Sequence, residues 1–200
     1  EIGVRLVGSE MCIRDRYKDK FESVSIAEPL LGEVGSDATV INADKEAVAK
    51  AITAAAVADS GFESLDAAKD AGTAFVFMGH GTAHVAKVTY SQMQTQMQNL
   101  GYENVFIGTV EGEPEETACE AVIEAVKAAG YTNVVLRPLM VVAGDHANND
   151  MAGSDDDSWK TMFEAAGFTV DCQIHGLGEI ADVQALYVAH TKAAIDSLNA

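Results

Sequence analysis

Basic residues are scarce in this sequence. The 200 residues hold 13 Lys and Arg against 31 Asp and Glu, which gives a formal net charge of −18 at pH 7. Nucleic-acid binding draws most of its affinity from Lys and Arg contacts to phosphates, so the composition argues against a nucleic-acid partner. So acidic a chain attracts cations instead.

Cysteine and long apolar runs are also scarce. The cysteines are Cys12, Cys119 and Cys172, which form neither a disulfide framework nor a CxxC zinc motif, and this favours a reducing, cytoplasmic setting. The sequence has no apolar run of about 18 residues, as a membrane-spanning helix would need, so we expect no membrane partner. Hydrophobic residues nevertheless make up 48% of the chain, enough for a sizeable core.

Residues 1–16 differ from the rest. The stretch LVGSEMCIRDR shows neither helical nor strand periodicity, and its back-translation resembles a transposon adapter used in preparing sequencing libraries. We interpret residues 1–16 as an assembly artefact and residues 17–200 as one α/β domain. On this interpretation the native start is missing, and the sequence says nothing of a signal peptide.

Apolar strands and amphipathic helices alternate along residues 17–200. Because the strands are apolar throughout, they predict a parallel sheet covered by helices on both faces. We expect Asp44 to cap the first helix and Pro114 to open another. The predicted strands are residues 23–31, 73–78, 104–112, 133–142 and 169–177, and the predicted helices are residues 44–58, 85–99, 114–130, 157–166 and 181–198.

Three successive strand ends carry side chains that can bind metals. His80 lies in MGHGTAH, Glu111 in GTVEGEPE, and Asp145 and His146 in VVAGDHANND. In open parallel sheets, ligands bind beyond the carboxyl ends of the strands, so these side chains should meet. The glycines beside His80 allow a sharp turn and a close approach.

Other polar motifs carry weaker signals. GHG lacks the third glycine of a dinucleotide fingerprint, and SDDDSW lacks EF-hand spacing and suits a helix cap better. His84 could equally be a neighbour of the site or a residue in the first turn of the following helix. His175 could equally line the cleft or make a structural hydrogen bond. His190 shares an apolar helix face with Leu186 and Tyr187, which favours core or interface packing.

Five stretches together resemble the anaerobic cobaltochelatase family, the class II chelatases that insert cobalt into sirohydrochlorin on the route to cobalamin. They are FVFMGHGTAH, GTVEGEPE, RPLMVVAGDHANNDMAG, DSWKTMFEAAG and GLGE. The resemblance runs from about residue 23 to the C-terminus. It implies a chelatase fold of two similar α/β halves with the active cleft between them. This chain would contribute the C-terminal half and a remnant of the N-terminal half, because family members have a complete half before residues 23–31.

The resemblance also implies a ligand set. The family holds its metal with a His, a Glu and a His, and those motifs fall here on His80, Glu111 and His146. It implies Co²⁺ as the substrate metal, sirohydrochlorin as the second substrate, and no organic cofactor. The sequence does not determine whether the chain forms a homo-oligomer.

The chemistry of these side chains agrees with such a role. Imidazole and carboxylate ligands suit Co²⁺, Ni²⁺ or Fe²⁺ without the tighter grip of thiolates. Metal insertion releases two pyrrole protons, and an imidazole, with an unperturbed pKa of about 6.5, can accept one. We expect His80 to be both ligand and base, with His146 facing it and Glu111 completing the site. Arg137, Lys87 or backbone amides are weak candidates for the carboxylates of sirohydrochlorin.

Two alternatives share these residues. A metal- or tetrapyrrole-binding carrier would use them without turnover. A related chelatase for Fe²⁺ or Ni²⁺ would use the same ligands.

Overall fold

The structure, a computed structural model, describes residues 16–32, 34 and 36–198. The expectation for residues 1–16 therefore lies, apart from Arg16, outside the described residues and stays a prediction. Within the described part of the chain, no helix is both long enough and apolar enough to span a membrane.

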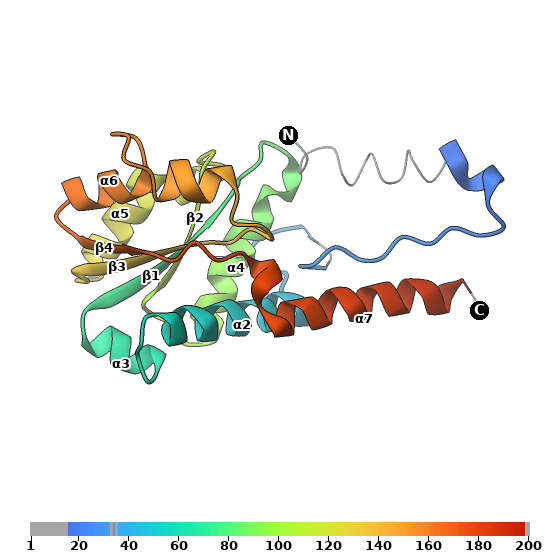
Figure 1. Cartoon of the computed structure of the whole chain (residues 1–200), viewed down its shortest axis with the longest axis horizontal. Coiled ribbons are helices and arrows are strands. Elements are labelled where there is room, and N and C mark those ends of the chain that lie inside the picture. The colour runs from blue at the N-terminus through green and yellow to red at the C-terminus, as the bar shows by residue number, and fades with distance from the viewer. Residues whose placement is uncertain (1–15, 33, 35, 199–200) are drawn as a thin grey trace.

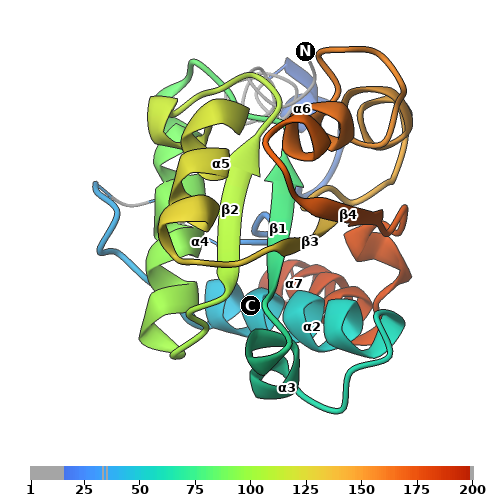
Figure 2. The ribbon, with the colours of Figure 1, turned by 90° about the vertical axis from the view of Figure 1, so that its left-hand side faces the viewer.

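A four-stranded parallel sheet forms the centre of the fold, which confirms the predicted α/β class. Its strand order is β2-β1-β3-β4, and all neighbouring pairs are parallel (Figure 2). The strands are β1 (Thr73–Gly79), β2 (Val105–Thr109), β3 (Asn133–Pro138) and β4 (Thr169–Cys172).

The strand β1 is buried along its whole length because both faces of the sheet are covered. Phe75 and Phe77 belong to one apolar core, while Val76 and Met78 belong to a second. Successive side chains of a strand point to opposite faces, so a continuous apolar run is what a doubly covered strand requires.

Helices cover the two faces of the sheet in separate layers (Figure 1). The core of Phe75 and Phe77 is completed by α2 (Ala43–Asp59), α4 (Val88–Asn99) and the start of α7 (Ala181–Ser197), with α3 (Leu65–Asp70) beside them. The other core is completed by α5 (Cys119–Ala128) and α6 (Trp159–Ala165). Short turns fill the connections: η1 (Lys18–Lys20), η2 (Val85–Lys87), η3 (Glu115–Thr117), the π-helical η4 (Ala147–Met151) and η5 (Leu177–Glu179).

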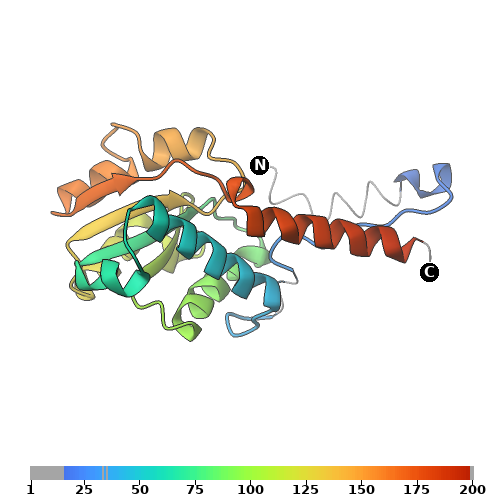
Figure 3. The same ribbon diagram turned by 60° about the horizontal axis from the view of Figure 1, so that its bottom comes forward.

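The predicted strand at residues 23–31 is wrong. This stretch is extended but pairs with no strand, and it runs beside α7 away from the sheet (Figures 1 and 3). Ser25 Oγ and Ser197 Oγ are 2.8 Å apart, so the segment and the helix are in direct contact.

Two helix starts also differ from the prediction. Asn42, not Asp44, caps α2, and its side chain accepts a hydrogen bond from the backbone N–H of Lys45. Pro114 precedes the short turn η3, and α5 begins only at Cys119. Asp44 therefore lies inside the first turn of α2, where a negative charge is favourable near the helix N-terminus.

Candidate metal centre

His80 directly follows β1 and lies between Gly79 and Gly81. Each glycine leaves space for a different neighbouring side chain. A Cβ on Gly79 would lie 2.3 Å from a ring carbon of Tyr90. Gly81 has φ +91°, and a Cβ there would lie 2.9 Å from Cβ of Glu111. The backbone N–H of Gly81 donates to the Tyr90 hydroxyl at 3.0 Å. The two glycines therefore let Tyr90 and Glu111 come close to His80.

Glu111 is brought to His80 by the pairing of β1 with β2. The register places Gly79 opposite Thr109, and the ladder continues past the strand ends. The backbone N–H of Glu111 donates to the carbonyl of His80 at 2.9 Å. As a result, Oε1 of Glu111 lies 3.9 Å from Nε2 of His80.

His146 reaches the same place from the loop after β3. It directly precedes the π-helix η4, and its ring centroid lies 4.7 Å from that of His80, with the planes at 80°. The structure thus brings together the three residues that sequence reasoning had selected. Asp145 lies beside them but is exposed, and its Oδ1 accepts from the Asn149 side chain at 2.7 Å.

Hydrogen bonds orient both imidazoles in the same sense. Nδ1 of His80 is 2.8 Å from the carbonyl oxygen of Gly81, and Nδ1 of His146 is 2.6 Å from Oδ2 of Asp150. A carbonyl and a carboxylate can only accept, so each Nδ1 carries the proton. In the neutral ring Nε2 then keeps its lone pair, the arrangement in which histidines usually bind metals. Asp150 was missed at the sequence level, although its position four residues after His146 could have indicated it.

The site is open rather than closed. The side chains of His80 and His146 are both 38% exposed, and that of Glu111 is 54% exposed. Among the described residues, the group of His, Cys, Asp and Glu side chains whose ligand atoms all lie within 4.8 Å is a different one, Glu28, Asp44 and His190. His80, Glu111 and His146 are therefore neighbours but do not form a ready coordination sphere.

The remaining candidate histidines have structural partners. His84 caps η2, and its Nδ1 accepts from the backbone N–H of Ala86 at 3.2 Å. Nδ1 of His175 lies 2.9 Å from Glu179 Oε2 in an exposed pair. His190 meets polar groups, the Glu28 carbonyl and the Asp44 carboxylate, rather than the apolar packing expected of it.

The two basic side chains considered for sirohydrochlorin carboxylates are already paired. Arg137 is a wrong candidate, because its side chain is 3% exposed and bonds Asp59 and Gln173 within the fold. Lys87 is more accessible, but its Nζ lies 2.6 Å from Glu113 Oε2.

The two cysteines among the described residues are poor metal ligands. Cys119 and Cys172 are free thiols, and Cys12 lies outside the described residues. Burial raises the pKa of Cys119 to about 12 and that of Cys172 to about 11, so both stay protonated near neutral pH. A thiol must lose its proton to bind a metal.

An acidic groove adjoins the site. It has a volume of about 560 Å³, and Glu111 lies in its wall with Glu120, Asp156 and Asp157. Three further carboxylates make this groove a better surface for a cation than for a polycarboxylate.

Comparison with known proteins identifies the family of the chain. The model of the cobalt chelatase (CbiK) family matches residues 5–196. A sirohydrochlorin cobaltochelatase of Salmonella typhimurium is 42% identical over 121 residues, which cover 60% of this chain and 44% of the relative. The sirohydrochlorin cobaltochelatase CbiKC of Nitratidesulfovibrio vulgaris is 30% identical over 184 residues, 92% of this chain and 58% of the relative. The chain thus spans about half the length of these curated relatives.

Proposed function

Because the chain belongs to the cobalt chelatase (CbiK) family, we propose that it takes part in inserting Co²⁺ into sirohydrochlorin, in cobalamin biosynthesis. His80, Glu111 and His146 would hold the metal. The observation that carries the proposal is the meeting of two imidazoles and one carboxylate beyond neighbouring strand ends. The relatives' names support the substrate, since both are sirohydrochlorin cobaltochelatases.

The ligand set fits a metal that must be released. Two imidazole nitrogens and a carboxylate oxygen bind Co²⁺ less tightly than a set that includes thiolates. Transfer of the ion to the four pyrrole nitrogens can therefore be favourable in free energy. The open arrangement leaves room for a ring to approach the ion. The acidic groove beside Glu111 would guide cations to the site by raising their local concentration.

Insertion exchanges two protons for one metal ion. The macrocycle loses two pyrrole N–H protons, and Co²⁺ forms bonds to the nitrogens left behind. Nε2 of His80 and Nε2 of His146 each carry a lone pair once the metal departs, so each can take one proton. A carboxylate can stabilise either imidazolium that forms, because Glu111 lies 3.9 Å from Nε2 of His80 and Asp150 lies 2.6 Å from Nδ1 of His146. We assign the first proton to His80, because Glu111 lies on the side of the nitrogen that takes it.

Three exposed apolar side chains lie close in sequence to the site histidines. Val141 and Val142 precede His146 in the loop after β3, and Val85 follows His80. All three are exposed, which suits contact with the flat apolar face of a tetrapyrrole. We expect the ring's carboxylates to be bound by the part of the relatives' length that this chain does not span.

The test is the absorbance change of sirohydrochlorin when the purified chain and Co²⁺ are added. We expect several cobalt-sirohydrochlorin molecules per chain, with formation above the uncatalysed rate, and loss of this excess in His80→Ala. Fe²⁺ and Ni²⁺ tested in parallel identify a chelatase for another metal. The exposure of the three side chains also suits a carrier, which would give at most one product or complex per chain.

A further inference from the structure

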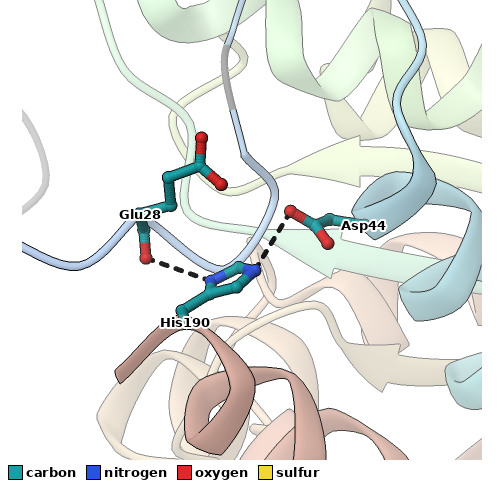
Figure 4. Close-up of side chains that lie close together, drawn as sticks. All are labelled: Glu28, Asp44 and His190. Carbon is teal, nitrogen blue, oxygen red and sulfur yellow. Dashed lines mark hydrogen bonds and ion pairs between the residues drawn. The ribbon is translucent and has the colours of Figure 1, made fainter. Parts of the chain in front are cut away.

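A second cluster of metal-binding side chains lies outside the cleft. Glu28 comes from the extended segment before α2, Asp44 from the first turn of α2, and His190 from α7 (Figure 4). One ligand atom from each lies within 4.8 Å of the other two. The cluster shares no residue with the His80 centre and is built by other elements.

The protonation of His190 is defined by its neighbours. Nδ1 lies 3.1 Å from the backbone carbonyl oxygen of Glu28, which can only accept, so Nδ1 carries a proton. Nε2 lies 3.2 Å from Oδ2 of Asp44. In a neutral imidazole with its proton on Nδ1, both of these atoms carry lone pairs and would repel, so a positive charge between or on them would be stabilising. That charge is either a second proton on the ring or a bound cation.

Two carboxylates lie at the cluster. Glu28 and Asp44 place two carboxylates at one imidazole, whereas a proton on His190 would neutralise only one of them. The side chains of His190 and Asp44 are 10% and 20% exposed, so water screens their charges only weakly. Lys45 adds a positive charge beside Asp44, and its ammonium also donates to the carbonyl of Leu31 at 2.8 Å. Charge alone therefore does not favour a metal ion, whereas the positions of the three ligand atoms do.

The geometry agrees with a small divalent ion. Nitrogen and oxygen ligands lie about 2.1 Å from a tetrahedral Zn²⁺, which puts neighbouring ligand atoms about 3.4 Å apart. The 3.2 Å between Nε2 of His190 and Oδ2 of Asp44 is close to that spacing. The Nδ1–H bond to a backbone carbonyl is the usual support of a histidine that binds metal through Nε2.

We propose that Glu28, Asp44 and His190 bind a divalent ion of the zinc and cobalt class, with water in the remaining position. The ion would join the segment of residues 23–29 to α2 and α7. This segment pairs with no strand, so the sheet does not hold it in place. A metal with one ligand in each of the three elements would do so.

The test uses a background that removes other ligands, the chain with Cys12→Ser, His80→Ala and His146→Ala. Calorimetric titration with Zn²⁺ should show one site per chain, and Zn²⁺ should raise the melting temperature. Adding His190→Gln, which keeps a donor for the Glu28 carbonyl, should weaken binding at least 100-fold and abolish the thermal shift. The matched control is His175→Gln, since His175 also faces a carboxylate but belongs to no such cluster among the described residues.

A further variant protects the test against misfolding. Glu28→Gln leaves the His190–Asp44 pair in place and should weaken Zn²⁺ binding at least 10-fold while the metal-free melt is unchanged. No Zn²⁺ binding in the background chain, or binding unchanged by His190→Gln or by Glu28→Gln, would mean an ion pair only and overturn the proposal. Because the cleft histidines are absent from this background, the result is independent of the proposed chelatase activity.

Discussion

The imidazole rings of His80 and His146 meet edge to face, with centroids 4.7 Å apart and planes at 80°. The two residues lie 66 positions apart in the chain (146 − 80), and only the pairing of β1 with β3 brings them together. Each ring is held through Nδ1 by its own acceptor. Each ring is thus already oriented, so binding a metal through Nε2 would cost it less rotational freedom.

Replacing His146 tests this centre directly. We expect His146→Ala to lower cobalt insertion by more than 100-fold, because changes even to the groups that orient metal ligands commonly cost about 10–100-fold. The fold should persist, since the side chain is partly exposed. The rate of cobalt-sirohydrochlorin formation and a thermal melt check both points. His175→Ala is the control and should keep the rate; an unaltered rate in His146→Ala would refute the ligand assignment.

Asp150 should matter through His146. Its Oδ2 lies 2.6 Å from Nδ1 of His146, so Asp150→Asn replaces a charged acceptor by an amide and weakens the hold on the ring. We expect the KM for Co²⁺ to rise about 10–100-fold, with a smaller change in the KM for sirohydrochlorin.

The comparison for this prediction is Asp145→Asn. Asp145 is exposed and its carboxylate accepts a hydrogen bond from the Asn149 side chain rather than from a site histidine, so its loss should leave both constants nearly unchanged. Equal effects of the two substitutions would assign Asp150 a general electrostatic role rather than a positioning one.

The sheet and its functional edge could be predicted from sequence because both depend on simple patterns. Apolar runs without alternation indicated strands covered on both faces, and β1 is buried throughout. Parallel strands present their carboxyl ends at one edge, so His80, Glu111 and His146 had to come near one another. The distances between them depend on register and loop shape, which local sequence does not encode.

Other features depend on contacts that no local pattern reveals. Residues 23–31 have the composition of a strand, yet they pair with no strand of the sheet. The His146–Asp150 pair is an exception, because its four-residue spacing is a local signal from which it could have been predicted, although the π-helix has no distinctive periodicity. The sequence predicted apolar packing for His190 because Leu186 and Tyr187 lie on the same helix. Its actual partners, Glu28 and Asp44, are remote in sequence.

The buried thiols predict a pH effect on stability. The pKa of Cys119 is raised to about 12 in the folded chain, above the value near 9 of a free thiol. The folded chain thus keeps a proton that the unfolded chain loses, and the free energy of unfolding should fall as pH rises from about 9 toward 12.

Urea unfolding between pH 8 and 11 measures this effect, and Cys119→Ala should make the dependence shallower. In a chain with Cys12→Ser and Cys172→Ser at pH 8, a thiol reagent should label Cys119 only after unfolding. Rapid labelling of the native chain would show that the Cys119 thiol is more exposed than the structure places it.

Gly81→Ala combines two costs at the site. The residue has φ +91°, where a side chain is strained by about 1–2 kcal/mol, and the added Cβ would lie 2.9 Å from Cβ of Glu111. Glu111 must then move away from His80, so we expect both a lower free energy of unfolding and a raised KM for Co²⁺. Gly101→Ala is the matched control, because Gly101 has φ +75° and its Cβ would meet nothing within 4 Å. Gly101→Ala should lower the free energy of unfolding in urea by a similar amount. Its KM for Co²⁺ should be unchanged. If the two variants have the same KM for Co²⁺, the close approach of Gly81 to Glu111 plays no part in metal binding.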